Sequence, residues 1–382
     1  MIYLDYAATN PIRPEVIELI QHSLQEEYGN PSSIYQIGKK SKQKLRQARE
    51  EMAQLLGVSA NEIYFTSGAT EANNWALRQQ AEQARQLGFG QHIVATAIEH
   101  PSVSEVLKHL EQDGFRVTYL KPNTAGNYTV NDFIAASSSD TIGWVAMAIN
   151  NELGTRLPIK DLGLAAREHN IPWFHVDTVQ MMGHLSTEDV AEYCTSFVGS
   201  AHKFAGPKGI GFLVYRPWDE RMILKPLLFG GGQEAKLRSG TENLPYIRGM
   251  VHALSLSTKE QDQANKQAHT YSTYIVDILT EQGILFEVNG VETDKVDHIL
   301  NLWLPGREAS QILIQLDLKD IYVSAGSACS AGSVSDSPVL QAYYPDQSDR
   351  WHQSIRISYG YQTTMEDIKT FTKILLEILE RK

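Results

Sequence analysis

The run that decides the fold is Trp173-Phe174-His175-Val176-Asp177, a short β-rich segment that ends in a carboxylate and is followed by Gln180. Similar runs alternate with helical patterns along the chain, at 63–65, 92–95, 117–120, 144–147 and 210–214. This alternation predicts an α/β fold with a mainly parallel sheet covered by helices on both faces. Ligands bind beyond the carboxyl ends of such strands, so Asp177 stands where a carboxylate could meet a cofactor nitrogen. The alternative is an aspartate that caps the next helix.

A second unit is expected after this region. Residues 244–279 are rich in Ala, Gln, Lys and Ile, and predict a long helix. The pattern then changes to α+β: strands at 284–288, 298–304 and 354–357, a helix at 307–316 and a last helix from Thr364. A length of 382 residues is enough for two or three domains. We therefore expect a smaller C-terminal domain.

Composition narrows the class of protein. Hydrophobic residues make up 42% of the chain and charged residues 21%, which is typical of a folded globular protein and excludes disordered or collagen-like chains. The formal net charge of −11 gives no general attraction for nucleic acid or anionic lipid, so small molecules or proteins are the expected partners. No signal pattern opens the chain and no apolar run is long enough to span a membrane, so we expect a cytoplasmic protein.

The two cysteines predict different roles. Cys194 and Cys329 are far apart and show neither a CxxC motif nor the Cys/His spacing of a zinc site. Cys194 stands in Tyr193-Cys194-Thr195-Ser196-Phe197, and we expect it to be a small buried hydrophobe. Cys329 lies among ten small residues, 324–333, that offer almost no apolar area to bury. This segment predicts a flexible loop with an exposed thiol, which is a candidate nucleophile.

Two further segments carry polar groups. In Thr66-Ser67-Gly68-Ala69-Thr70-Glu71 a strand runs into small residues and a helix start, whose N–H groups predict an anion cradle or simply a capped helix. In Ser200-Ala201-His202-Lys203 an apolar run leads to a lysine beside a Gly-Pro-Lys-Gly turn. Loss of hydration would lower the pKa of such a lysine and allow a Schiff base, whereas most lysines are solvated surface charges.

These segments occur in an order that extends over nearly the whole chain. The order is Tyr3-Leu4-Asp5-Tyr6-Ala7-Ala8-Thr9, Gly29-Asn30-Pro31-Ser32-Ser33, 66–71, Asn150-Asn151-Glu152, Val176-Asp177, His202-Lys203, 238–243, Ser327-Ala328-Cys329 and Ser354-Ile355-Arg356. Together they resemble the cysteine desulfurases of the class V aminotransferase group, in the branch with a long nucleophile loop. The resemblance implies the pyridoxal-phosphate-dependent transferase fold of type I. A large cofactor-binding domain would span residues 14–255, and a small domain of 1–13 and 256–382 would carry the Cys329 loop.

The resemblance also implies a cofactor, pyridoxal 5′-phosphate. Lys203 would hold it through a Schiff base, Asp177 would pair with its pyridine nitrogen, and His100 would stack on its ring as a catalytic residue. The remaining contacts implied are Gln180 and Asn151 near the ring's phenolate oxygen, Ala69, Thr70, Ser200 and His202 at the phosphate, and Thr241 at the phosphate of the neighbouring subunit of a homodimer.

L-Cysteine is the substrate that the resemblance implies. Arg356 would grip its carboxylate bidentately, and Asn30 would lie beside it. Cys329 would take the sulfur as a persulfide and carry it to an acceptor protein, while alanine leaves. No metal site is expected, beyond a transient iron–sulfur contact through Cys329.

The acceptor and two rival activities stay open. The chain stops at Lys382, whereas members that serve iron–sulfur assembly have a longer C-terminal tail, so a tRNA-thiolating enzyme or another sulfur acceptor is an equal candidate to a scaffold protein. The acidic net charge argues against direct binding of tRNA. A selenocysteine lyase could use the same residues, whereas another class V aminotransferase needs no loop thiol. A non-catalytic sulfur-carrier scaffold is the alternative from a different class.

Overall fold

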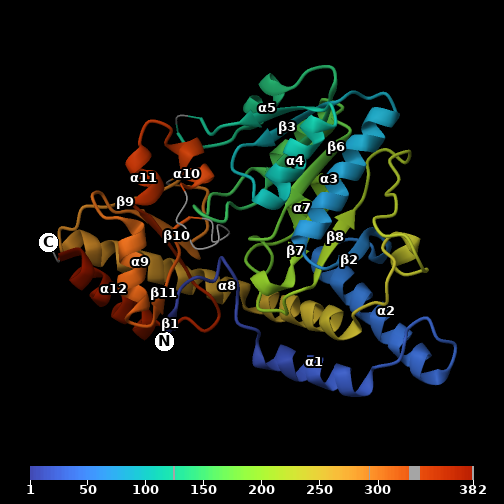
Figure 1. The fold of residues 1–382 in the computed structure, drawn as a ribbon, viewed down its shortest axis with the longest axis horizontal. Coiled ribbons are helices and arrows are strands. Elements are labelled where there is room, and N and C mark those ends of the chain that lie inside the picture. Colours follow the sequence, from blue (N-terminus) through green and yellow to red (C-terminus); the bar gives the residue numbers. More distant parts are fainter. Residues whose placement is uncertain (124, 292, 327–335, 381–382) are drawn as a thin grey trace.

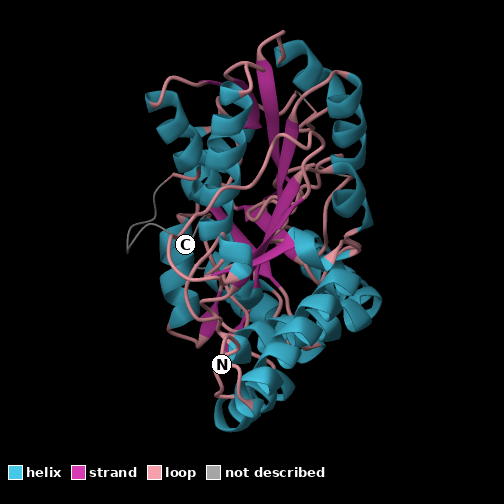
Figure 2. Cartoon of the chain, turned by 90° about the vertical axis from the view of Figure 1, so that its right-hand side faces the viewer, coloured by secondary structure: helices cyan, strands magenta, loops and turns pink. Residues whose placement is uncertain are grey.

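The computed structural model describes residues 1–123, 125–291, 293–326 and 336–380. Its larger sheet lies between layers of helices (Figures 1 and 2). The strand order is β2-β8-β7-β6-β5-β3-β4. The bounds are Ile63–Thr66 for β2, His92–Thr96 for β3, Arg116–Leu120 for β4, Thr141–Met147 for β5, Trp173–Asp177 for β6, Ser196–Ser200 for β7 and Gly211–Tyr215 for β8.

The sheet is mainly parallel, as the sequence predicted. Strands β3 to β7 run parallel to one another, whereas β8 is antiparallel to both β7 and β2. Only residues 201–210 connect β7 to β8, and a parallel pair needs a crossover of a dozen or more residues. The short connection therefore forces the reversal.

Alternate side chains of the strands enter cores on opposite faces of the sheet. Trp144 and Ala146 pack on one face with Phe174, while Val145 packs on the other with Trp173. The helices of this unit are α1 (Pro14–Glu26), α2 (Gln36–Leu56), α3 (Ala69–Gln86), α4 (Pro101–Gln112), α5 (Val130–Ala136), α6 (Ile159–Glu168) and α7 (Glu188–Tyr193), with 3₁₀ turns η1 (Ala60–Glu62), η2 (Ala201–Lys203) and η3 (Glu234–Lys236). Both faces are thus covered.

The long helix α8, Leu244–Glu281, joins the two units. It packs against α1 and α2 near its start and against α12 near its end. The second unit has a sheet of order β12-β10-β9 and a β1-β11 pair, with its own apolar core. Its elements are β1 (Ile2–Tyr3), β9 (Glu287–Val288), β10 (Ile299–Trp303), α9 (Ala309–Asp317), β11 (Ile321–Tyr322), α10 (Pro338–Tyr343), α11 (Ser348–His352), β12 (Ser354–Ser358) and α12 (Met365–Glu380).

The N-terminus belongs with the C-terminal elements in space. Strand β1 pairs with β11, and Asp5 forms a bridge with Ser358 of β12. The chain then crosses to the larger sheet, where Asn10 N–H donates to the carbonyl oxygen of His202. Residues 5–10 therefore lie between the two units. In the described part of the chain, no helix has the length and apolar character needed to cross a membrane.

Candidate active site

A cavity of about 570 Å³ opens at the carboxyl ends of β3, β5, β6 and β7, beside the first turn of α3. This is the position in which open α/β sheets bind ligands. The predicted site residues that line it are Ala69, Thr70, His100, Asn151, Asp177, Gln180, Ser200, His202, Lys203 and Arg356.

Two predicted residues of the described part of the chain, Asn30 and Thr241, do not line this cavity. Asn30 lies in an exposed turn, where its Oδ1 accepts a hydrogen bond from the Ser32 N–H at 2.9 Å. Thr241 is exposed as well, in the connection before α8. Cys329 lies outside the described residues. Cys194, expected to be buried, is fully buried, and burial raises the pKa of its thiol.

Lys203 ends the short turn η2, directly after β7. Its Nζ donates hydrogen bonds to the carbonyl oxygens of Ala7 and Ala8, at 2.6 and 2.9 Å. Its own carbonyl oxygen accepts a hydrogen bond from the Asn10 side chain at 3.0 Å. The N-terminal segment thus holds both ends of this lysine in the cavity.

Asp177 ends β6 and is 5% exposed. Its Oδ1 accepts a hydrogen bond from the Val179 N–H at 3.0 Å. The residues that follow form turns and the next helix, α7, begins at Glu188, so Asp177 is not the helix cap that the sequence left as an alternative. Its Oδ2 accepts a second bond, at 2.9 Å, from the side-chain amide of Asn73. The carboxylate is therefore fixed in direction and still lines the cavity.

Sequence reasoning missed Asn73, which lies one turn into α3. Its Oδ1 is 2.9 Å from Nε2 of His175, a fully buried ring. Burial lowers the pKa of His175 to about 3, so the ring is neutral and donates its Nε2–H to Asn73. The signal for this contact was the helical position of Asn73, three residues beyond Thr70 on the face that buries Ala72 and Ala76.

His100 caps the start of α4. The Ser102 N–H donates to its Nδ1 at 3.1 Å, which places the ring proton of the neutral form on Nε2. Burial lowers the pKa of His100, the charge of Asp177 opposes this shift, and Lys203 adds to it. A neutral imidazole therefore faces the cavity.

The first turn of α3, where the sequence predicted an anion cradle or a capped helix, lines the cavity. Gly68 precedes it and supplies no side-chain cap for the N–H groups of this helix start, and Ser200 and His202 line the same cavity. Burial, together with the charges of Lys203 and Lys208, lowers the pKa of His202 to about 4. A neutral donor ring, lysines and a helix N-terminus together favour an anionic group here.

Glu99 is a buried carboxyl group that sequence reasoning did not single out. Its Oε1 accepts hydrogen bonds from Thr96 Oγ1 at 2.5 Å and from the Met147 N–H at 2.8 Å, which joins the ends of β3 and β5. Burial raises its pKa to about 8, and the charge of Asp177 adds to this shift. The available signal was its place directly before His100.

A model of the aminotransferase class-V family matches residues 2–371 of the chain. The chain belongs to this family. It is 38% identical to the cysteine desulfurase IscS of Methanosarcina thermophila and also 38% identical to the cysteine desulfurase IscS of Dictyoglomus turgidum. Each match covers the whole of this chain, with 92% and 95% of the respective relative. The resemblance found in the sequence is confirmed.

Solved structures of the family share the fold. A NifS-like protein is 32% identical and has a TM-score of 0.90, with 99% of both chains covered. SspA in complex with cysteine is 30% identical and has a TM-score of 0.77, with 94% of this chain and 98% of that chain covered. The predicted fold class is therefore confirmed over both units.

Proposed function

We propose that the protein is a cysteine desulfurase, which uses pyridoxal 5′-phosphate to convert L-cysteine to L-alanine and transfers the sulfur to Cys329. The observation that carries the proposal is the convergence of Lys203, Asp177, His100 and Arg356 on one cavity. Full-length similarity to enzymes of this name supports it. The role of Cys329 rests on the sequence.

The residues around the cavity fit this cofactor. The first turn of α3 with Ser200 and His202 would hold the phosphate, because these residues line the cavity and a helix N-terminus favours an anionic group. Asp177 would pair with the pyridine nitrogen, and the neutral ring of His100 would stack on the cofactor ring. When bound through Lys203, the cofactor supplies an electron sink for the bonds at the substrate's Cα. Gln180 and Asn151 would contact the phenolate oxygen of the cofactor ring.

Three residues of the chain would have separate roles in the reaction. Arg356 binds the substrate carboxylate, and Lys203 Nζ takes the proton from Cα. The carbonyl oxygens of Ala7 and Ala8 accept hydrogen bonds from this nitrogen and hold it at the cavity. The Cys329 thiolate attacks the substrate sulfur: an S–S bond forms, the Cβ–S bond breaks, and Cβ retains the electron pair and is protonated. The sum is L-cysteine plus a thiol giving L-alanine plus a persulfide.

The proposed assembly is a cytoplasmic homodimer of two-domain subunits, with the boundaries 14–255 and 1–13 with 256–382. Large apolar side chains are exposed on the α1–α2 connection, Tyr28 and Ile34, and on the connection before η3, Phe229. Both connections lie toward the right-hand side of Figure 1. A second copy that covers them would also meet Thr241. A protein that elutes with the mass of a monomer while it holds its full cofactor would contradict the dimer.

The persulfide would pass to an acceptor protein, either a scaffold for iron–sulfur clusters or an enzyme of tRNA thiolation. Transfer to a protein suits the net charge of −11, which gives no attraction for tRNA itself.

The test is a product assay on purified protein that carries the cofactor. With L-cysteine and a reductant, we expect equal amounts of alanine and sulfide from the wild type and neither from Cys329→Ala, which still binds cysteine. A parallel assay with L-selenocysteine separates this function from a selenocysteine lyase. Alanine release that persists in Cys329→Ala would contradict the persulfide step, and a protein that binds no cofactor would indicate the non-catalytic scaffold.

A further inference from the structure

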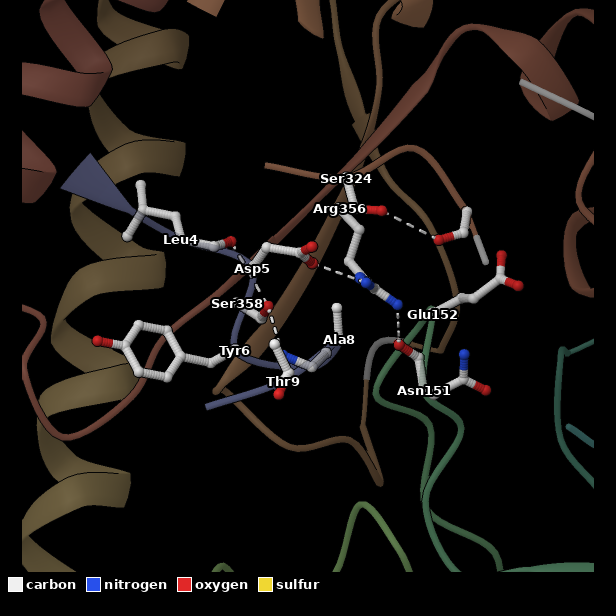
Figure 3. Close-up of polar contacts among 12 residues, drawn as sticks. Leu4, Asp5, Tyr6, Ala8, Thr9, Asn151, Glu152, Ser324, Arg356 and Ser358 are labelled. Carbon is white, nitrogen blue, oxygen red and sulfur yellow. Dashed lines mark hydrogen bonds and ion pairs between the residues drawn. The ribbon is translucent and has the colours of Figure 1, made fainter. Parts of the chain in front are cut away.

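The guanidinium of Arg356 is buried and held from two directions. The residue is 2% exposed. Its Nη2 donates to Oδ1 of Asp5 at 2.8 Å, and its Nη1 donates to the backbone carbonyl oxygen of Asn151 at 2.9 Å. Figure 3 shows Asp5 and Asn151 on different sides of the group. These contacts fix the direction in which the remaining N–H donors point.

One of those donors, Nε, is available to bind a ligand. Within the described residues, Nε of Arg356 is buried and has no hydrogen-bond partner. The side chain lines the cavity that also contains Lys203. A buried donor without a partner is costly, and a carboxylate is the group that a guanidinium binds best. Arg356 is thus held ready for a carboxylate at this end of the cavity.

Among the described residues, Asp5 is the ion-pair partner of Arg356. Glu152 is also buried nearby, but its Oε2 accepts a short hydrogen bond from Ser337 Oγ. Burial raises the pKa of Glu152, against the opposing effects of Ser337 and Arg356, and so favours its uncharged form. Asp5 therefore supplies the negative charge that balances the buried guanidinium.

Asp5 is itself fixed to the strand that carries Arg356. It forms a bridge with Ser358, two residues further along β12. The Ser358 N–H donates to the carbonyl oxygen of Leu4 at 2.8 Å, and Ser358 Oγ accepts from the Ala7 N–H at 2.9 Å. Leu4 is fully buried. The ion pair is thus held by backbone contacts on both sides of Asp5 (Figure 3).

The same segment reaches Lys203, because the carbonyl oxygens of Ala7 and Ala8 accept hydrogen bonds from its Nζ. Residues 5–8 thereby set the spacing between a guanidinium and an amine that face one cavity. An α-amino acid carries its amino and carboxylate groups on one carbon atom, so its recognition depends on this spacing.

We propose that Asp5 is a positioning residue, which orients Arg356 so that the cavity selects a substrate with a free α-carboxylate beside its amino group. The inference rests on the proposed function. It gives the N-terminal motif around Asp5 a task in substrate recognition, beyond its place in the fold.

The test compares Asp5→Ala with Asp5→Asn in the cofactor-loaded protein. We expect Asp5→Ala to raise KM for L-cysteine about tenfold or more, with kcat changed by less than about threefold, because Arg356 loses the hydrogen-bonded carboxylate that orients it toward the substrate. Asp5→Asn keeps an oxygen acceptor for Nη2 and should recover most of the KM. The matched control is Asp140→Asn, which removes the charge from an exposed pair with Arg116 and should change neither constant.

Calorimetric binding of L-alanine separates this inference from the proposed function. Alanine has the carboxylate but no sulfur, so Asp5→Ala should weaken its binding about tenfold even if the wild type releases no alanine from cysteine. Unchanged KM and alanine affinity, or tighter binding in Asp5→Ala, would overturn the inference. An equal loss in Asp5→Asn and Asp5→Ala, together with a lowered urea midpoint in both, would assign Asp5 to folding alone.

Discussion

The imidazole rings of His184 and His298 lie face to face, with their centroids 3.7 Å apart and their planes 10° from parallel. Both line a cavity of about 330 Å³ beside α8. Burial lowers the pKa of His184 to about 4 and that of His298 well below its usual value, to which His184 contributes. Both rings are therefore neutral in the folded protein at pH 7.

This pair predicts a loss of stability in mild acid. In the unfolded chain both histidines have pKa values near 6.5, so between pH 6.5 and 4 the unfolded chain binds protons that the folded chain does not. The free energy of unfolding should fall as the pH falls through this window, by at most about 1.4 kcal/mol per pH unit for each histidine. Urea unfolding of His184→Phe should show a shallower dependence, whereas the exposed control His109→Gln should not. An unchanged slope in His184→Phe would contradict the assignment.

Glu99 predicts a dependence of the opposite sign. Its pKa is about 8 when folded and 4.5 as a free group, so between these values the folded chain holds a proton that the unfolded chain has lost. Stability from this group is therefore lost as the pH rises from 4.5 to 8. Glu99→Gln cannot ionise and keeps an oxygen for Thr96 and Met147, so it should be more stable than the wild type at pH 8, by about 1 kcal/mol or more.

Melting temperatures at pH 5 and pH 8 check this. The gain in Glu99→Gln should grow with pH, while the exposed control Glu105→Gln should show none. A gain of the same size at both pH values would mean that Glu99 is ionised in the folded protein.

Local sequence was enough to predict most strands, the helix α8 and the residues at strand ends. It missed β7, because Ser196, Gly199 and Ser200 give this strand little apolar character. The hydroxyl group of Ser196 has hydrogen-bond partners inside the sheet. Its Oγ accepts a hydrogen bond from Gln80 Nε2 at 2.9 Å and lies 2.8 Å from His175 Nδ1. Polar residues that are paired in this way carry no hydrophobic signal.

The site residues also fall into those that local sequence motifs indicate and those that only the folded structure brings to the site. Lys203 and Asp177 stand in short motifs whose chemistry is visible locally, whereas a role for His100 came only from the resemblance to a known family. The residues that hold them act from far along the chain: Asn73 reaches Asp177 across 104 positions, and Asp5 reaches Arg356 across 351. Such contacts depend on the register of strands that one sequence does not fix, so only the fold brings them into view.

A close approach in the sheet gives a steric prediction. A Cβ on Gly143 of β5 would lie 2.1 Å from the ring of Trp173 on the neighbouring strand, and Trp173 is fully buried. Gly143→Ala should therefore lower the free energy of unfolding by about 2 kcal/mol or more. Gly232→Ala is the matched control, because no atom lies within 4 Å of a Cβ built there. Urea titrations of both variants measure the difference, and equal stability would show that Trp173 can move aside.

Asn73 gives a prediction that separates support of the cofactor site from support of the fold. Asn73→Ala removes the amide that donates to Asp177 and leaves the Nε2–H of His175 buried without a partner. We expect the affinity for pyridoxal 5′-phosphate to fall about tenfold and the free energy of unfolding of the apoprotein to fall by about 1–3 kcal/mol. Asn74→Ala is the control, since within the described chain this half-buried neighbour donates a hydrogen bond to the Thr70 carbonyl oxygen and makes none to Asp177 or His175. Titration of the apoprotein with the cofactor, followed by absorbance, gives the affinity. Lowered stability with unchanged affinity would show that Asn73 serves His175 and the core, and that Asp177 keeps its direction through Val179 alone.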